Sequence, residues 1–275
     1  MRPKPPSLAS KPQRGPSAAA QAANRVPRPV AALARSDPAG TQIAPHLHAR
    51  DQFIYAIRGV MTIRANGFIW TIPPSHGMWM PAHTVHQIHM DTEVEMRTLY
   101  LQPGTVAGLG DGCQVLAVTP LLRELILRAM AVPPRYALDS ADARLMNLIV
   151  DEVGRLEPQP LSLKLPTDKR LTRLCQLLIE DPGHAGSIAE LGRQVGLSER
   201  SVIRLFPQET GLSLHRWRQQ ARLMRAFALS DQGMNIGQLA DELGYASASA
   251  FGKMFAKQFG QAPRRVFGEA SGGMR

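Results

Sequence analysis

The segment Ser187-Ile-Ala-Glu-Leu-Gly-Arg-Gln-Val-Gly-Leu-Ser-Glu-Arg-Ser-Val-Ile-Arg-Leu-Phe206 is informative because its pattern returns near the carboxyl end. The second copy reads Asn235-Ile-Gly-Gln-Leu-Ala-Asp-Glu-Leu-Gly-Tyr-Ala-Ser-Ala-Ser-Ala-Phe-Gly-Lys-Met-Phe255. The copies superpose at an offset of 48 residues before the turn and 49 after it, because the second turn has one extra residue. Each copy predicts a helix, a turn and a second helix.

Residue types at the start and end of the first helix of each copy support this prediction. Ser187 and Glu190 have the spacing of a capping box, and Asn235 and Gln238 repeat it. Gly196 stands where the chain leaves the first helix, a position that commonly needs a left-handed backbone.

Apolar residues at helical spacing predict one buried stripe on each helix of the first copy. These residues are Ile188, Leu191, Val195, Val202, Leu205 and Phe206. Arg200, Ile203 and Arg204 are left on the outer face of the second helix, which a recognition helix turns to the major groove of DNA. A plain helical hairpin without a nucleic-acid partner is the alternative.

The net charge of +10 is unevenly distributed along the 275 residues. Residues 1–36 hold seven basic residues and no acid, residues 37–165 have a net charge of −2, and residues 166–275 have a net charge of +5. A basic repeat region is typical of a protein with a polyanionic partner.

Cysteine content and hydropathy indicate the compartment in which the protein acts. The two cysteines, Cys113 and Cys175, have no metal-type spacing, and such usage favours a reducing compartment. No segment reaches the roughly 18 apolar residues of a membrane span, and the first residues lack the apolar core of an export signal. We therefore expect a cytoplasmic protein without a membrane partner.

Composition divides the chain into four predicted parts. Residues 1–36 read as a disordered basic tail, because prolines are scattered through a polar, alanine-rich background. Residues 37–118 hold short β-rich runs and an Asn66-Gly67 hairpin signal, which predict a small barrel or sandwich. Residues 119–165 read as a helical hairpin and linker, and residues 166–275 contain the repeat.

The helical hairpin must bury an apolar stripe. Leu122, Leu125, Ile126 and Ala129 mark the stripe on its first helix. Such a stripe packs either against the barrel or against a second copy of the hairpin, so a homodimer is one of two alternatives.

The repeat resembles the DNA-binding domain of the AraC/XylS family of bacterial transcription regulators over about 100 residues. The residues of the resemblance are Ile188-Ala-Glu-Leu191, Val195-Gly-Leu-Ser198, Leu205-Phe206, Gly211, Ile236, Leu239-Ala240, Leu243-Gly-Tyr245, Phe251, Phe255, Phe259-Gly260 and Pro263. In that family a long helix joins the two units, and Ser213 to Leu229 has the expected length.

The resemblance implies which side chains meet DNA bases. These positions are Arg200, Ile203 and Arg204 in the first unit, and Ala248, Ser249, Ala250 and Lys253 in the second. Arginine reads guanine by a bidentate contact, whereas alanine and serine offer weaker contacts. We therefore expect the first unit to set most of the sequence specificity.

Residues 40–86 resemble a cupin, a small β-barrel. The first motif is Gly40, His46, His48, Gln52 and Gly59 in the family's spacing, and Pro81-Ala-His83 followed by His86 resembles the second. Metal-binding cupins hold their ion at positions that correspond here to His46, His48, Gln52 and His86. Gln52 stands where a carboxylate is expected, which weakens a divalent-metal site.

Three interpretations of the histidines remain open: a bound metal ion, a metal-free pocket that hydrogen-bonds a small effector, and a structural role. We adopt the second as the working prediction, without a metal ion or other cofactor. The predicted effector-binding residues are His46, His48, Gln52, Tyr55, Trp79 and His86.

Together these patterns predict an α+β fold with an N-terminal cupin-like β-barrel, a helical linker and an all-α C-terminal domain with two helix-turn-helix motifs. The predicted function is a transcription regulator that binds double-stranded DNA under control of a small-molecule effector, without catalytic residues. Activation and repression are both consistent with the sequence. The alternative is a metal-dependent cupin enzyme fused to a DNA-binding domain.

Overall fold

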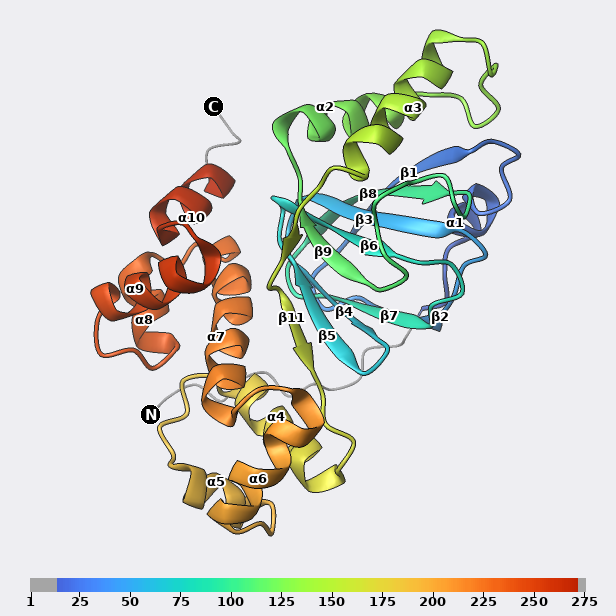
Figure 1. Cartoon of the computed structure of the whole chain (residues 1–275). Coiled ribbons are helices and arrows are strands. Elements are labelled where there is room, and N and C mark those ends of the chain that lie inside the picture. The colour runs from blue at the N-terminus through green and yellow to red at the C-terminus, as the bar shows by residue number, and fades with distance from the viewer. Residues whose placement is uncertain (1–13, 272–275) are drawn as a thin grey trace. The chain divides into compact units, whose positions relative to one another are not determined.

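The computed structural model describes residues 14–271, which divide into two compact units (Figure 1). The first consists of residues 14–66 and 71–159 and is rich in strands. The second consists of residues 67–70 and 160–271 and is mostly helical. This arrangement confirms the predicted α+β class.

Two antiparallel sheets form the barrel. The six-stranded sheet has the order β1 (Val30–Asp37), β8 (Val94–Leu101), β3 (Asp51–Arg58), β6 (His76–Met80), β9 (Gln114–Ala117) and β10 (Pro158–Gln159). The five-stranded sheet has the order β11 (Ser162–Lys164), β5 (Phe68–Ile72), β4 (Met61–Ala65), β7 (His86–Met90) and β2 (Gln42–His46).

Asn66 and Gly67 join β4 to β5 with φ angles of 49° and 75°. Positive φ at both central residues is what a type I′ hairpin turn requires, and Asn-Gly adopts it readily. The hairpin predicted from this pair is therefore confirmed.

Both faces of the six-stranded sheet are covered. Phe53, Tyr55 and Leu99 lie in one buried cluster with residues of α2 (Pro120–Ala129) and α3 (Ala141–Val153). Because side chains alternate along a strand, Gln52 and Tyr100, which are direct partners across β3 and β8, lie on the opposite face.

The helical hairpin buries its stripe against the barrel. Leu122, Ile126 and Ala129 of α2 are fully buried in the cluster that contains Phe53 and Leu99. Of the two alternatives for this stripe, packing on the barrel is the one observed.

Residues 14–36 are ordered, so the predicted disordered tail is wrong for this part; residues 1–13 lie outside the described residues. Ser17 caps α1 (Ala18–Ala23), and β1 pairs with β8 along its whole length. Small apolar residues such as Ala20, Ala23 and Ala31 make the contacts here. Because these residues are only weakly hydrophobic and stand among many prolines and arginines, the sequence of this region has no clear strand pattern.

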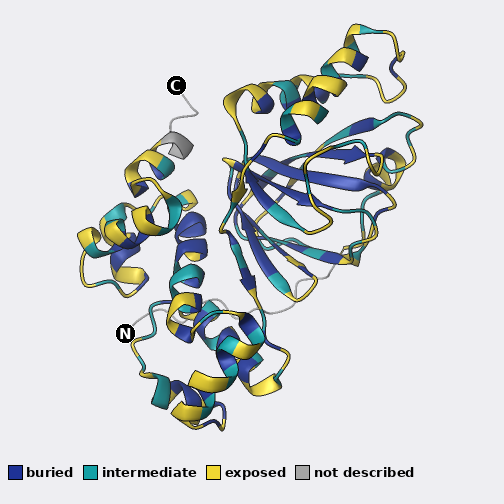
Figure 2. Ribbon diagram, viewed as in Figure 1, coloured by how far each residue is buried: buried dark blue, intermediate teal, exposed yellow. Residues whose placement is uncertain are grey.

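Residues 165–271 of the helical unit contain seven helices. They are α4 (Lys169–Glu180), α5 (Ile188–Gln194), α6 (Glu199–Thr210), α7 (Leu214–Asp231), α8 (Ile236–Glu242), α9 (Ala248–Phe259) and α10 (Pro263–Ser271). Each predicted helix-turn-helix is present, as α5–α6 and α8–α9. The helices bury one side and expose the other (Figure 2).

Candidate nucleic-acid interface and histidine site

The first helix-turn-helix is built as its residue types predict. Ser187 Oγ accepts a hydrogen bond from the Glu190 backbone N–H at 3.2 Å, and Glu190 Oε2 accepts one from the Ser187 N–H at 2.8 Å. Gly196 has a φ of +74°, and Ser198 caps α6 by accepting from the Ser201 N–H at 3.1 Å. These bonds fix where α6 begins and how it leaves the turn.

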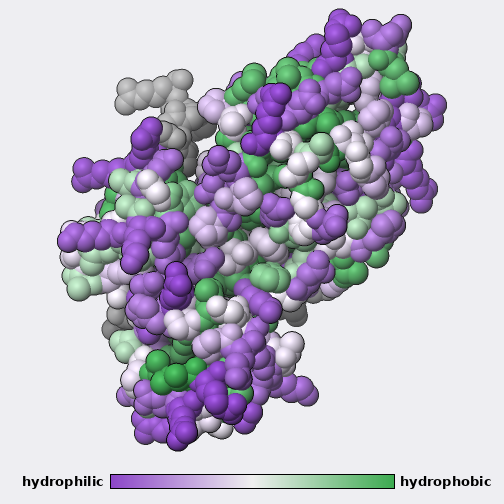
Figure 3. Space-filling view, viewed as in Figure 1, coloured by the Kyte–Doolittle hydropathy of each residue, from purple (hydrophilic) through white to green (hydrophobic). Residues whose placement is uncertain are grey.

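The predicted base-contacting side chains of α6 are on its outer face. Arg200 and Arg204 are exposed, and Ile203 is 56% exposed although it is a large apolar residue. Val202 and Phe206 on the inner side are fully buried. In the view of Figure 3, hydrophilic side chains lie beside a small hydrophobic patch at the end of the helical unit that holds α5 and α6.

The second helix-turn-helix repeats this construction. Asn235 and Gln238 form a capping box at the start of α8, and Gly244 at its end has a φ of +71°. Phe251 and Phe255 of α9 are buried. The predicted base-contacting residues lie on the outer side, where Ala248, Ser249 and Lys253 are exposed and Ala250 is half-buried.

Helix α7 joins the two units and has 18 residues, so it is about 27 Å long. It buries an apolar face that includes Trp217, Ala221 and Met224. Arg222 donates from Nε to the Pro182 carbonyl oxygen at 2.7 Å, and its guanidinium lies 5.1 Å from the centre of the Tyr245 ring. Arg222 of α7 therefore contacts both the loop before α5, through Pro182, and the turn between α8 and α9, through Tyr245.

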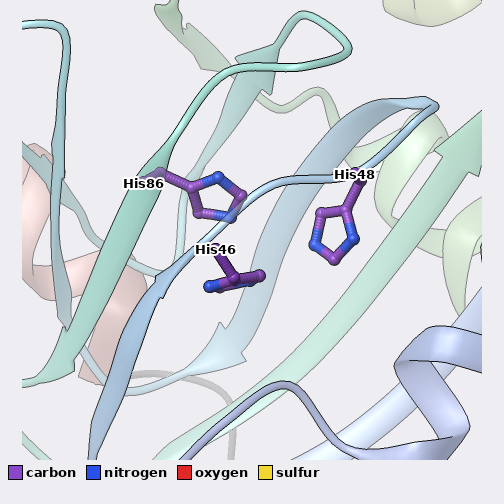
Figure 4. A group of neighbouring side chains, drawn as sticks. All are labelled: His46, His48 and His86. Atoms are coloured by element: carbon purple, nitrogen blue, oxygen red, sulfur yellow. The ribbon is translucent and has the colours of Figure 1, made fainter.

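Three histidines meet in the barrel, and their rings point toward one another (Figure 4). His46 at the end of β2 and His86 at the start of β7 are direct partners across the two strands. Their ring centroids are 4.2 Å apart, and those of His46 and His48 are 4.9 Å apart. One ligand nitrogen from each of the three rings lies within 4.8 Å of the others.

Backbone carbonyl groups fix two of the rings. His46 Nδ1 is 2.8 Å from the Ala44 oxygen, and His86 Nδ1 is 2.9 Å from the Thr84 oxygen. A carbonyl oxygen is an acceptor, so each Nδ1 carries the proton and each Nε2 has a free lone pair. Burial lowers the pKa of His46, that of His48 to about 4, and that of His86 to about 3.

Gln52 lies on the face of the sheet that meets the histidines. Its strand partner Tyr100 has its ring 5.1 Å from that of His48, in an edge-to-face contact. The oxygen Gln52 Oε1 is buried without a hydrogen-bond partner, and so is Thr98 Oγ1 on the same face.

Sequence reasoning missed Tyr100 and Thr98. Thr98 and Tyr100 are two residues apart on β8, so their side chains lie on the same face as those of their partners Ile54 and Gln52. This alternation was the feature of the sequence that could have indicated them.

The structure does not bring the other two predicted effector-binding residues to the histidines. Tyr55 and Trp79 lie in the buried cluster between the six-stranded sheet and the helices α2 and α3. The Tyr55 hydroxyl lies beside Arg123 of α2. Tyr55 is an odd number of residues from Gln52 on β3, and Trp79 pairs with Phe53, so both side chains point to the opposite face of the sheet from Gln52 and lie outside the histidine site.

His83, which replaces the glycine of the second motif, is outside the cluster. It is exposed and keeps a glycine-like φ of +61°, and its N–H donates to the His48 carbonyl oxygen at 2.7 Å. It therefore shapes the loop that holds His48.

Comparison with known proteins assigns both units. A family described as a helix-turn-helix domain matches residues 191–268, and one described as an AraC-like ligand binding domain matches residues 29–185. The chain belongs to the AraC family of transcription regulators. The AraC-family resemblance predicted from the sequence is thereby confirmed.

Two curated regulators and one solved structure are among the proteins similar to this chain. The HTH-type transcriptional regulator NimR of Escherichia coli is 31% identical over 80% of this chain and 80% of its own length. The RCS-specific HTH-type transcriptional activator RclR of Escherichia coli is 27% identical over 72% of this chain and 76% of its own. Among solved structures, ToxT of Vibrio cholerae is 12% identical over 89% of this chain and 99% of its own, with a TM-score of 0.38.

As an AraC-family member, the chain is a DNA-binding transcription regulator with a ligand-binding domain. Among the helices of residues 14–271, none combines the length and apolar composition of a membrane span.

Proposed function

We propose that α6 and α9 of this regulator enter successive major grooves on one face of a DNA duplex, and that an effector held by the barrel histidines controls this binding. The observation that supports the DNA arrangement is the repeat itself. Two helix-turn-helix units on one chain, joined by an ordered helix, serve two adjacent half-sites without a dimer.

The dimensions of the helical unit support this arrangement. Helix α7 is about 27 Å long. Successive major grooves on one face of a duplex are about 34 Å apart, one helical turn. The helices at either end of α7 add their own width to its length, so the two units together can extend over this distance.

The two units contact bases unequally in this proposal. Arg200 and Arg204 offer guanidinium groups that read guanine, with about 1–3 kcal/mol of discrimination for a good bidentate contact. Ala248 and Ser249 of α9 are small, and Lys253 contacts phosphate. The first unit therefore sets base preference, and the second contributes affinity and recognition of DNA shape.

The effector contacts His46, His48, Gln52 and His86 in this proposal. Its support is the set of buried polar atoms without hydrogen-bond partners, since such atoms are costly to bury unless another group satisfies them. The effector alters DNA binding because it has unequal affinity for two conformations of the regulator. The site serves regulation rather than catalysis.

We further propose that the regulator acts in the cytoplasm.

We also propose that a second copy of the protein covers the exposed leucines of the α2–α3 hairpin. Leu121 is 53% exposed and Leu148 is 41% exposed although the stripe beside them is buried. Sedimentation equilibrium should show a dimer for the wild type and a monomer for Leu148→Lys. A monomeric wild type at micromolar concentration would exclude this association.

Selection of bound sequences from a random duplex library tests the DNA proposal with the full chain. We expect one strongly conserved stretch in the enriched duplexes, and footprinting of these duplexes should show two protected stretches whose centres are about 10 base pairs apart. Protection of one stretch alone, or no enrichment, would contradict the use of both units.

A further inference from the structure

The helical unit has a hollow beside the start of its second recognition helix. Helices α8, α9 and α10 lie together near the end of α7 (Figure 1). The hollow is lined by residues from all four helices, among them Ser230, Met234, Ile236, Arg264 and Phe267. Ala248, the first residue of α9, lines it as well. The hollow therefore adjoins the helix that is proposed to enter the major groove.

Glycines leave the hollow open. Gly233, in the segment between α7 and α8, has a φ of +91°, and Gly268 lies within α10. Among the described residues, a Cβ added to either glycine would meet nothing within 4 Å apart from its own chain neighbours. The space at these two positions is therefore free for a group from outside the chain.

One cation and apolar walls give the hollow its chemistry. Of the described residues that line it, Arg264 alone is charged, and this side chain is exposed. No ion pair within residues 14–271 includes Arg264. Met234, Ile236 and Phe267 supply apolar surface. This combination suits a sugar–phosphate strand, which offers anionic phosphates and the carbon edges of its sugars.

The first helix-turn-helix unit has a hollow at the corresponding place, but its charge is opposite. The segment before α5 forms it, as the segment before α8 forms the other. Asp181 and Glu190 line this hollow, and His184 Nδ1 lies 3.5 Å from Asp181 Oδ2. Two carboxylates repel a phosphate. The two hollows are therefore suited to different ligands, although the helices around them repeat.

We propose that the hollow between α8 and α10 receives the sugar–phosphate backbone of one DNA strand, and that Arg264 binds a phosphate beside the major groove that α9 enters. The inference rests on the proposed function and adds a DNA contact outside the two recognition helices. A phosphate contact positions the protein and carries no base preference. It supplies affinity to the unit whose recognition helix presents only small side chains at Ala248 and Ser249.

The salt dependence of DNA affinity tests the contact with the full chain on the selected duplex. Arg264→Ala should weaken binding about tenfold at low salt, because a charge-assisted hydrogen bond is lost. It should also reduce the slope of log affinity against log salt by about one and leave the selected base preference unchanged. Arg265→Ala is the matched control, since Arg265 is an exposed neighbour that does not line the hollow. Its slope should equal that of wild type.

Ethylation interference locates the phosphate. Ethylation neutralises one phosphate at a time, so binding fails where a neutralised phosphate is needed. We expect wild type to depend on a phosphate in the less conserved protected stretch, which the second unit occupies. Arg264→Ala should lose its dependence on this phosphate and keep its dependence on the others. A purely structural role of Arg264 would leave the pattern of sensitive phosphates unchanged.

Two substitutions of Gly268 test the charge of the hollow independently of Arg264. Gly268→Glu and Gly268→Gln introduce side chains of the same shape at an open, exposed position, and thermal unfolding verifies both folds. Gly268→Glu should bind the duplex more weakly than Gly268→Gln, because its carboxylate repels the phosphate. The difference should shrink as salt is added.

The outcomes separate this contact from DNA binding as such. Equal losses in Arg264→Ala and Arg265→Ala, or equal affinities of the two Gly268 variants, would overturn the backbone site while wild type still binds its duplex. Failure of wild type to bind any duplex would overturn the proposed function itself, and the backbone site with it.

Discussion

Gly183 and Gly244 lie backbone to backbone: a Cβ added to Gly244 would be 2.6 Å from the carbonyl oxygen of Gly183. Gly183 belongs to the loop before α5 and Gly244 to the turn between α8 and α9. The loop before the first helix-turn-helix unit is therefore in direct contact with the turn of the second unit, in addition to the connection through α7. Such a contact restricts movement of the α8–α9 turn relative to the loop before α5.

Gly244→Ala should destabilise the helical unit and weaken binding to two-site DNA. At a φ of +71° an L-residue costs about 1–2 kcal/mol, and the clash with Gly183 adds about 1–3 kcal/mol. Gly196→Ala is the control, because Gly196 has a φ of +74° but nothing within 4 Å of an added Cβ. Urea unfolding that gave equal losses for both variants would argue against the backbone contact.

Arg222→Ala should lower the free energy of unfolding of the helical unit by about 1–3 kcal/mol. The variant loses a charge-assisted hydrogen bond to the Pro182 carbonyl and the stacking on Tyr245. Arg225→Ala, on an exposed position of the same helix, should change it by less than about 0.5 kcal/mol. Urea denaturation followed by tryptophan fluorescence compares the two, and a larger effect at Arg225 would refute the assignment.

Arg204→Ala should relax base preference more than Lys253→Ala does. A guanidinium distinguishes bases in the major groove, whereas a lysine on phosphate adds affinity that is nearly independent of sequence. Sequence selection with each variant measures the preference at every position of the site. The unequal roles of α6 and α9 fail if the lysine variant gives the broader set of sequences.

The stability of the barrel should fall as the pH drops from about 6.5 to about 4, partly through His76. Burial lowers the pKa of His76 to about 4, so the folded protein holds it neutral where the unfolded chain takes up a proton. Proton uptake by the unfolded state favours unfolding, and the contribution is complete above pH 6.5.

His76→Gln should therefore reduce the slope of the free energy of unfolding against pH. Urea denaturation between pH 7.5 and pH 5 measures that slope, and the exposed His83→Gln serves as control. An unchanged slope in His76→Gln would show that His76 titrates alike in both states.

The helical unit was predictable because its signals are local. Capping boxes at Ser187 and Asn235, and glycines at Gly196 and Gly244, act over four or five residues and occur in both copies. The burial of Phe206 and Phe255 follows from helical periodicity. Contacts between the units, such as that of Gly183 with Gly244, join residues 61 positions apart and leave no periodic signal.

The barrel was harder to predict in detail because both faces of its main sheet are buried. Alternation shows that Gln52 and Tyr55 lie on opposite faces, but the sequence does not show which face meets the histidines. Tyr55 and Trp79 lie in apolar surroundings because α2 and α3 pack on their face of the sheet. The sequence pattern of such residues is the same as that of residues that line an apolar pocket. The meeting of His46, His48 and His86 followed from motif spacing, whereas the role of Tyr100 required the strand register.

The dependence of DNA affinity on salt concentration measures whether α6 and α9 bind the phosphates of a DNA duplex. The full chain is titrated onto its selected duplex at several salt concentrations between about 50 and 200 mM. A protein that neutralises several phosphates should show a steep linear fall of log affinity against log salt, and Lys253→Ala should reduce the slope by about one. A flat dependence, or no attachment to any duplex at low salt, would contradict the proposed binding of α6 and α9 to DNA.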